Sequence, residues 1–212
     1  MEHDNFIITI NREFGTGGRE IAQKLGNILG VKVYDKNLLD SLAQQFIMTE
    51  NDIENAKPKR NGWWDEFTNF YKQFGSSNHV DFKERVTSRE IYHAEEKILK
   101  ELAEKESCII VGRAGFHIFK DYPNAVKVLL VADFDARVKR LCETMDLSVS
   151  EASRMIKEID DKREKYTKKY TGLSRYDAHN YDFVINVTNI PTYHVAVFLA
   201  QNMRWKFNNN GL

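Results

Sequence analysis

Short β-branched runs alternate along this sequence with stretches that carry the apolar spacing of amphipathic helices. The runs lie at residues 6–10, 31–35, 107–111, 125–131 and 181–186. Runs of this length match buried strands, and helical connections between them are what parallel strand pairing requires. The alternation therefore predicts an α/β protein with a doubly wound parallel sheet.

Helical patterns fill most of the sequence between these runs. The first contains Ile21, Leu25, Ile28 and Leu29 and ends at Gly30. Others are expected at 82–105, 133–141 and 191–207, and two more begin near Lys36 and Ser148. Residues 50–80 are loop-like and rich in aromatic side chains, so we interpret them as an excursion from the main fold.

Composition and charge exclude several classes of protein. The chain has 31 Lys+Arg and 31 Asp+Glu, and 42% of its residues are hydrophobic. Neutrality argues against a duplex nucleic-acid binder, and the hydrophobic content argues against global disorder. No apolar run approaches the roughly 18 residues that a membrane span needs, and the N-terminus does not resemble a signal peptide. We expect a soluble cytoplasmic protein that binds neither nucleic acid nor membrane, with homo-oligomerisation left open.

The turn after the first strand is the strongest candidate for a binding site. In open α/β sheets, ligands bind beyond the carboxyl ends of strands. A helix N-terminus attracts phosphate there through its N–H groups and dipole, and glycine lets the backbone come close. A tight structural turn with surface arginines is the alternative. The candidate phosphate-binding residues are Arg12, Gly15, Thr16, Gly17, Gly18 and Arg19.

This turn departs from the standard phosphate loop, G-x-x-x-x-G-K-[ST]. If Gly18 is aligned with the lysine of this motif, Arg12 stands at its first glycine. If Arg19 is aligned with the lysine instead, Glu13 stands at the first glycine and Glu20 at the hydroxyl residue. Arg19 still offers a guanidinium that suits two phosphate oxygens. The Glu20 carboxylate repels a triphosphate unless Mg²⁺ lies between them, or else it complements the helix dipole.

Six stretches of the chain carry a family resemblance. They are ITINREFGTGGREIA at 8–22, YDK at 34–36, IVGRAG at 110–115, VADFDARVKR at 131–140, DKREKY at 161–166 and NYDFVIN at 180–186. In this order, across nearly the whole chain, they resemble the cytidylate kinase-like proteins, relatives of the nucleoside monophosphate kinases in the P-loop NTPase superfamily. Only residues 50–80 match poorly.

The resemblance implies a domain organisation and an activity. It implies one domain over residues 1–212, with a core of 1–49 and 106–212, an acceptor-binding helical excursion at about 50–105 and a lid at about 160–178. The implied reaction moves the γ-phosphoryl group of ATP to a pyrimidine nucleoside monophosphate with Mg²⁺. Such a transfer asks the protein mainly for positioning and positive charge.

The resemblance also implies roles for residues beyond the turn. Arg137 would lie near adenine and Arg140 near the phosphates, although a solvated helical face explains both equally well. Asn186 and Thr188 fall where the family encloses adenine, mainly through the backbone. Arg113 matches an arginine that contacts the acceptor, but Ala114 follows it where true cytidylate kinases have aspartate.

Asp35, at the end of the second strand run, is placed to meet the acceptor or a metal-bound water, or to cap the next helix. The six histidines show no metal-ligand spacing, so we assign no metal ligands to protein side chains.

The basic segment from Lys162 to Arg175 is where a lid would close on polyphosphate. It holds six basic residues and one acid, Glu164. Asp160, Asp161 and Arg163 are the best match to the family's acid-and-arginine lid motif, while a solvated helix face is the alternative. The expected catalytic residues are Arg19, Arg140, Asp160 and Arg163.

Two competing functions remain at this point. A catalytically inactive nucleotide- or phosphate-binding protein would explain the altered phosphate loop. A nucleic-acid-associated or structural partner protein is the weaker reading, because the chain carries no net charge.

Overall fold

The first strand pairs on both of its sides and so lies in the middle of a parallel sheet. In the computed structural model, which describes residues 5–35, 39 and 88–208, five strands are ordered β2-β3-β1-β4-β5 and pair in parallel throughout. The predicted doubly wound sheet is confirmed, and each predicted run forms one strand. The strands are β1 (Ile7–Arg12), β2 (Lys32–Tyr34), β3 (Cys108–Val111), β4 (Ala125–Val131) and β5 (Phe183–Asn186).

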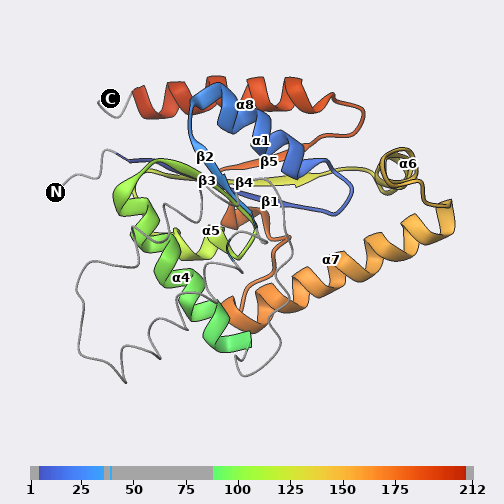
Figure 1. The fold of residues 1–212 in the computed structure, drawn as a ribbon, viewed down its shortest axis with the longest axis horizontal. Coiled ribbons are helices and arrows are strands. Elements are labelled where there is room, and N and C mark those ends of the chain that lie inside the picture. Colours follow the sequence, from blue (N-terminus) through green and yellow to red (C-terminus); the bar gives the residue numbers. More distant parts are fainter. Residues whose placement is uncertain (1–4, 36–38, 40–87, 209–212) are drawn as a thin grey trace, which may run out of the picture. The chain divides into compact units, whose positions relative to one another are not determined.

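Helices lie on both faces of this sheet. The described helices are α1 (Gly18–Leu29), α4 (Ser88–Lys105), α5 (Gly115–Ile118), α6 (Phe134–Met145), α7 (Val149–Thr171) and α8 (Thr192–Asn208). Figure 1 shows α1 and α8 together on one face and α5 on the other. The short α5 was not predicted, because four residues are too few to display helical periodicity. The helical pattern expected from Lys36 lies almost wholly outside the described residues.

The main core lies between the sheet and the α1–α8 layer. Ile8 and Ile10 of β1 are fully buried there against Ile21 and Leu25 of α1 and Leu199 of α8. Fully burying a side chain of this size stabilises the fold by about 1.5–3 kcal/mol. The 3.6-residue periodicity that predicted α1 therefore marks its buried face.

Alternation along β1 determines where its last residues point. Side chains two apart share one face of a strand. Ile8 and Ile10 face α1, and Arg12 follows them on that side, where it packs against Gly18. Thr9 faces the other way and meets Gly115 of α5. Arg12 therefore leaves the sheet at its carboxyl edge, beside the start of α1.

The chain divides into two compact units. One contains Met1–Tyr34 and Ala103–Leu212, and the other Asp35–Leu102. The second unit includes most of α4, whose Ile98, Leu99 and Leu102 are fully buried. Most of the expected excursion at about 50–105, with its aromatic segment, lies outside the described residues. Within the described ranges, no helix is long and apolar enough to cross a membrane.

Candidate functional site

The turn between β1 and α1 has the backbone of an anion site. Gly15 (φ 89°) and Gly17 (φ 74°) adopt the left-handed conformation that glycine enters without a steric penalty. The Thr16 hydroxyl donates a hydrogen bond to the Glu13 carbonyl (2.9 Å) and so closes the turn. No side chain caps α1 at Gly17. The N–H groups at the start of α1 are thus directed at the turn, as phosphate binding requires.

Helix α6 packs directly on this turn. A Cβ atom at Gly15 would lie 3.0 Å from the Cβ of Arg137, and one at Gly17 would lie 2.7 Å from the Arg140 guanidinium carbon. The Arg137 guanidinium donates to the Phe14 carbonyl (3.3 Å). The two glycines therefore also make room for the two arginines of α6, a role that the sequence did not reveal.

A pocket of about 200 Å³ lies beside the turn. The turn, α6 and the loop after β5 form its walls, so Gly15, Thr16, Arg137, Arg140 and Thr188, all predicted separately, are brought together there. Its other lining residues are Ala132, Ala136, Lys139, Glu143, Val187, Asn189 and Ile190.

The loop after β5 is fixed by hydrogen bonds. The Asn186 side-chain oxygen accepts the Thr188 N–H (2.9 Å), and the Thr188 hydroxyl accepts the Asp133 N–H (2.8 Å). Asn186 is therefore a support for the pocket wall and is not among the residues that line it.

Glu20 carries an ion-pair network at the edge of the turn. Its Oε2 pairs with Nη2 of Arg140 at 2.5 Å, and its Oε1 accepts from Nζ of Lys24 (2.9 Å) and the Thr192 hydroxyl (2.7 Å). Hydrogen bonds from Lys24 and then Thr192 hold the pKa of Glu20 below its ordinary value. Arg140 thus reaches the turn already paired with a carboxylate.

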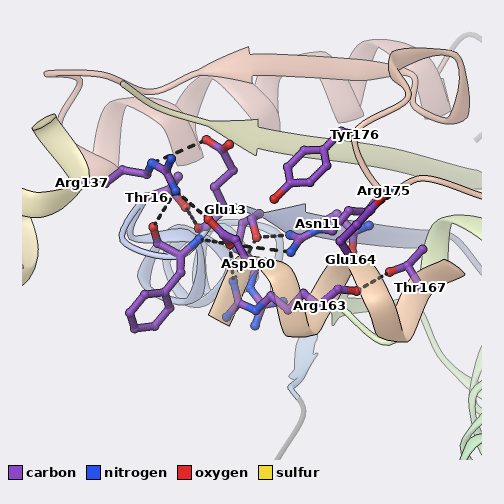
Figure 2. A network of polar contacts seen from close by, with 12 residues as sticks. Asn11, Glu13, Thr16, Arg137, Asp160, Arg163, Glu164, Thr167, Arg175 and Tyr176 are labelled. Atoms are coloured by element: carbon purple, nitrogen blue, oxygen red, sulfur yellow. Dashed lines mark hydrogen bonds and ion pairs between the residues drawn. The ribbon is translucent and has the colours of Figure 1, made fainter. Parts of the chain in front are cut away.

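Asp160 of α7 connects three arginines to the turn. Its carboxylate accepts the Phe14 N–H at 2.8 Å and an Nη1 hydrogen bond of Arg137 at 2.7 Å. Arg163 and Arg175 approach the same carboxylate at 3.8 and 3.7 Å. Figure 2 shows these groups converging on Asp160. The predicted pair Asp160 and Arg163 therefore contacts the backbone of the turn between β1 and α1.

Two of these arginines bind the backbone of Arg12. Arg163 donates to the Arg12 carbonyl at 3.1 Å, and Arg175 donates to the same oxygen through Nη2. Burial, and then the charge of Arg175, lowers the pKa of Arg163 to about 10. The sequence analysis assigned Arg175 no role of its own. Gly172, the C-cap of α7, ends the helix, and the chain that follows it brings Arg175 back to the turn.

Arg12 and Arg19 take different positions. The side chain of Arg12 lies across Gly18, and its guanidinium reaches Gly112, the residue after β3. Arg19 is exposed on the first turn of α1.

The two predicted acceptor-binding residues belong to different compact units. Arg113 and Ala114 have left-handed backbones (φ 56° and 52°), and the Arg113 guanidinium lies 5.6 Å from the Tyr166 ring centre. Burial lowers the pKa of Arg113. Asp35 belongs to the second unit, where its carbonyl accepts the Leu39 N–H (3.0 Å).

The carboxylates at the turn are poor candidates for magnesium ligands. Glu13 accepts the Ala132 N–H at 3.0 Å and lies 3.7 Å from Arg137, and Glu20 is engaged as described above. In the described part of the chain, no group of three His, Cys, Asp or Glu side chains is placed to hold a metal ion.

A family model joins these elements in one match. The model of the cytidylate kinase-like family matches residues 7–189, which include the turn, α6 and α7. The chain belongs to the cytidylate kinase-like family. The resemblance stated from the sequence is thereby confirmed for the family as a whole.

A comparison with solved structures found several proteins similar to this cytidylate kinase-like chain. An uncharacterized protein from Eubacterium ventriosum is 24% identical with a TM-score of 0.70, and the match covers 94% of this chain and 98% of that one. A shikimate kinase from Bacteroides thetaiotaomicron is 13% identical (TM-score 0.49; 96% and 98% covered). A gluconokinase from Sinorhizobium meliloti is 11% identical (TM-score 0.48; 97% and 99% covered). A search of the curated proteins found no significant match.

Proposed function

We propose that this protein is an ATP-dependent phosphotransferase that moves the γ-phosphoryl group to a pyrimidine nucleoside monophosphate. The observation that carries the proposal is the pocket where Arg137, Arg140 and Thr188 adjoin the uncapped start of α1. A base and ribose in this pocket would direct their phosphates along the turn, toward the N–H groups of α1. The family match supports a kinase-like protein.

The transfer breaks the bond between the γ-phosphorus and the oxygen of the leaving ADP and forms one to a phosphate oxygen of the acceptor. In this proposal, Arg12, Arg19, Arg140 and Arg163 supply positive charge along the phosphates, and Mg²⁺ enters with ATP. Arg113 and Asp35 would meet the acceptor. The excursion at about 50–105 would receive it, and the lid at about 160–178 would exclude water.

A catalytically inactive nucleotide- or phosphate-binding protein of the same fold is the second candidate. Helix α1 begins at Gly18 directly after the left-handed Gly17, so Gly18 stands at the lysine position of the standard loop. A side chain there would have to displace Arg12, because its Cβ would lie 2.7 Å from Cγ of that arginine. Arg140 is also engaged by Glu20. Both observations favour binding without transfer.

Two assays on the full chain separate the candidates. Binding of a fluorescent ATP analogue tests whether the pocket holds a nucleotide. Formation of ADP in the presence of CMP, dCMP, UMP, AMP or GMP tests for phosphoryl transfer. Arg140→Ala should weaken ATP binding about tenfold or more, since a hydrogen bond to a charged group contributes about 1.5–3 kcal/mol. Arg154→Ala, which removes an exposed arginine of α7 away from the pocket, is the matched control and should bind as the wild type does.

ADP formation that requires a pyrimidine monophosphate would support the phosphotransferase. ATP binding that Arg140→Ala weakens, with no transfer to any acceptor, would support the inactive binding protein. If neither ATP nor any monophosphate binds, both candidates are wrong.

A further inference from the structure

The Arg12 side chain occupies the space that a residue at Gly18 would need. A Cβ atom at Gly18 would lie 2.7 Å from Cγ and 2.9 Å from Cβ of Arg12, so the start of α1 is in van der Waals contact with the stem of this arginine. Relative to the standard loop, where the first position is glycine and the seventh is lysine, the long cationic side chain and the glycine have exchanged places.

The guanidinium of Arg12 lies where the ends of two neighbouring strands meet. β1 and β3 pair in parallel, with Ile10 opposite Val111, and the Gly112 N–H donates to the Ile10 carbonyl at 3.0 Å. A Cβ atom at Gly112 would lie 2.6 Å from Nη1 of Arg12. The guanidinium therefore lies between the turn after β1 and the turn after β3.

The backbone of Arg12 is held by charged donors. Its carbonyl accepts hydrogen bonds from Arg163 and Arg175, and the second of these side chains is only 2% exposed. Both arginines approach Asp160, which also binds Arg137. Arg163 and Arg175 thus place positive charge beside residue 12, and an anion bound there would be attracted to them.

We propose that Arg12 binds the phosphate chain of the donor at the point of transfer and supplies the charge that lysine supplies in the standard loop. This inference rests on the proposed function for its substrate, a nucleoside triphosphate. A guanidinium bonds two phosphate oxygens at once, and its charge persists at every physiological pH. Because Gly18 and Gly112 have no side chains, the Arg12 side chain can extend between the two turns.

The test measures binding of inorganic tripolyphosphate and of ATP to the full chain by calorimetry. Arg12→Gln should weaken tripolyphosphate binding at least tenfold, and Arg12→Lys should restore part of the loss. Arg19→Gln should weaken it by less than Arg12→Gln does, because Arg19 is exposed on α1. Arg154→Gln is the control for net charge. An Arg12→Gln protein that binds as tightly as wild type, or a larger loss with Arg19→Gln, would overturn the assignment.

A double-mutant cycle tests the exchange of positions directly. Gly18→Ala should displace Arg12 and weaken tripolyphosphate binding by about as much as Arg12→Gln, and the double variant should lose nothing more. Circular dichroism and thermal unfolding would show whether each variant is folded. Losses that multiply in the double variant would mean that Gly18 acts on the turn independently of Arg12 and would contradict the proposal.

Transfer assays separate this inference from the proposed function. If tripolyphosphate binding depends on Arg12 but wild type phosphorylates no acceptor, the Arg12 assignment holds and the phosphotransferase proposal fails. If wild type transfers phosphate and Arg12→Gln leaves kcat/KM unchanged, the phosphotransferase proposal holds and the Arg12 assignment fails. A fall in kcat/KM of about 100-fold or more supports both.

Discussion

Glu20 stands in the first turn of α1, where an acid complements the helix dipole. Its carboxylate also bonds Arg140 of α6 and Thr192 at the start of α8. These partners are 120 and 172 residues away in the sequence. One side chain thus connects three helices around the turn, and neither interpretation drawn from the sequence included these contacts.

Because of these contacts, we expect the contribution of Glu20 to the free energy of unfolding to depend on pH. Hydrogen bonds from Lys24 and Thr192 lower the pKa of Glu20 from 4.5. The native carboxyl therefore releases its proton at lower pH than the unfolded one, so its contribution is complete above pH 4.5 and disappears as the pH falls through the native pKa. Because the carboxylate is 46% exposed and screened by solvent, the contribution is about 1 kcal/mol or less.

Glu20→Gln should accordingly lower Tm by up to about 4 °C at pH 7, and by progressively less as the pH approaches 3. Thermal unfolding monitored by circular dichroism across this range measures the difference. Glu158→Gln, which changes an exposed acid of α7, is the control and should leave Tm unaltered. A Tm difference for Glu20→Gln that stays constant with pH would contradict the argument.

Helix α7 separates its charges between two faces. Lys165 pairs with Asp161 at 2.7 Å and Lys168 with Glu164 at 3.0 Å, both along the helix, so much of the basic surplus predicted for a lid is already paired. Asp160 lies on the face that meets the turn, together with Arg163 (Figure 2). Helical spacing of three and four residues explains this division.

The two neighbouring aspartates of α7 give a matched test of that division. Asp160→Asn leaves three buried or half-buried arginines without their carboxylate and should destabilise the fold by about 3 kcal/mol, which lowers Tm by about 6–12 °C. Asp161→Asn removes an exposed pair and should cost about 1 kcal/mol or less. Denaturant unfolding measures both, and equal losses would show that α7 is not attached through Asp160.

The order of the strands assembles the site at one edge of the sheet. β1 lies between β3 and β4, and β5 follows β4, so the turns after these four strands share the carboxyl edge. They contribute the glycine turn, the Gly112–Ala114 segment, Ala132 and the loop at Val187. Ligands of open α/β sheets bind at such an edge.

Binding at this edge should raise the stability of the whole unit. A ligand at about 100 times its Kd adds about 2.7 kcal/mol, equivalent to about 5–10 °C in Tm for a chain of this size. We expect Mg²⁺-ATP and CMP to produce separate shifts in a thermal unfolding assay, with sodium chloride of equal ionic strength as the control. If phosphate or sulfate alone raises Tm and no nucleotide does, the site binds small anions but not nucleotides.

The sequence by itself determined the strands, most of the helices, the glycine turn and the family. These depend on local periodicity and on motifs that remain contiguous in the chain. Only the tertiary structure decided that α1 begins at Gly18 and that Arg12 lies across it. It also decided that Arg163 and Arg175 bind the Arg12 carbonyl. The physical reason is that the order of the strands and the packing of the helices decide which charged side chains meet. The partners in these contacts are more than 100 residues apart in the sequence, so no local pattern predicts them.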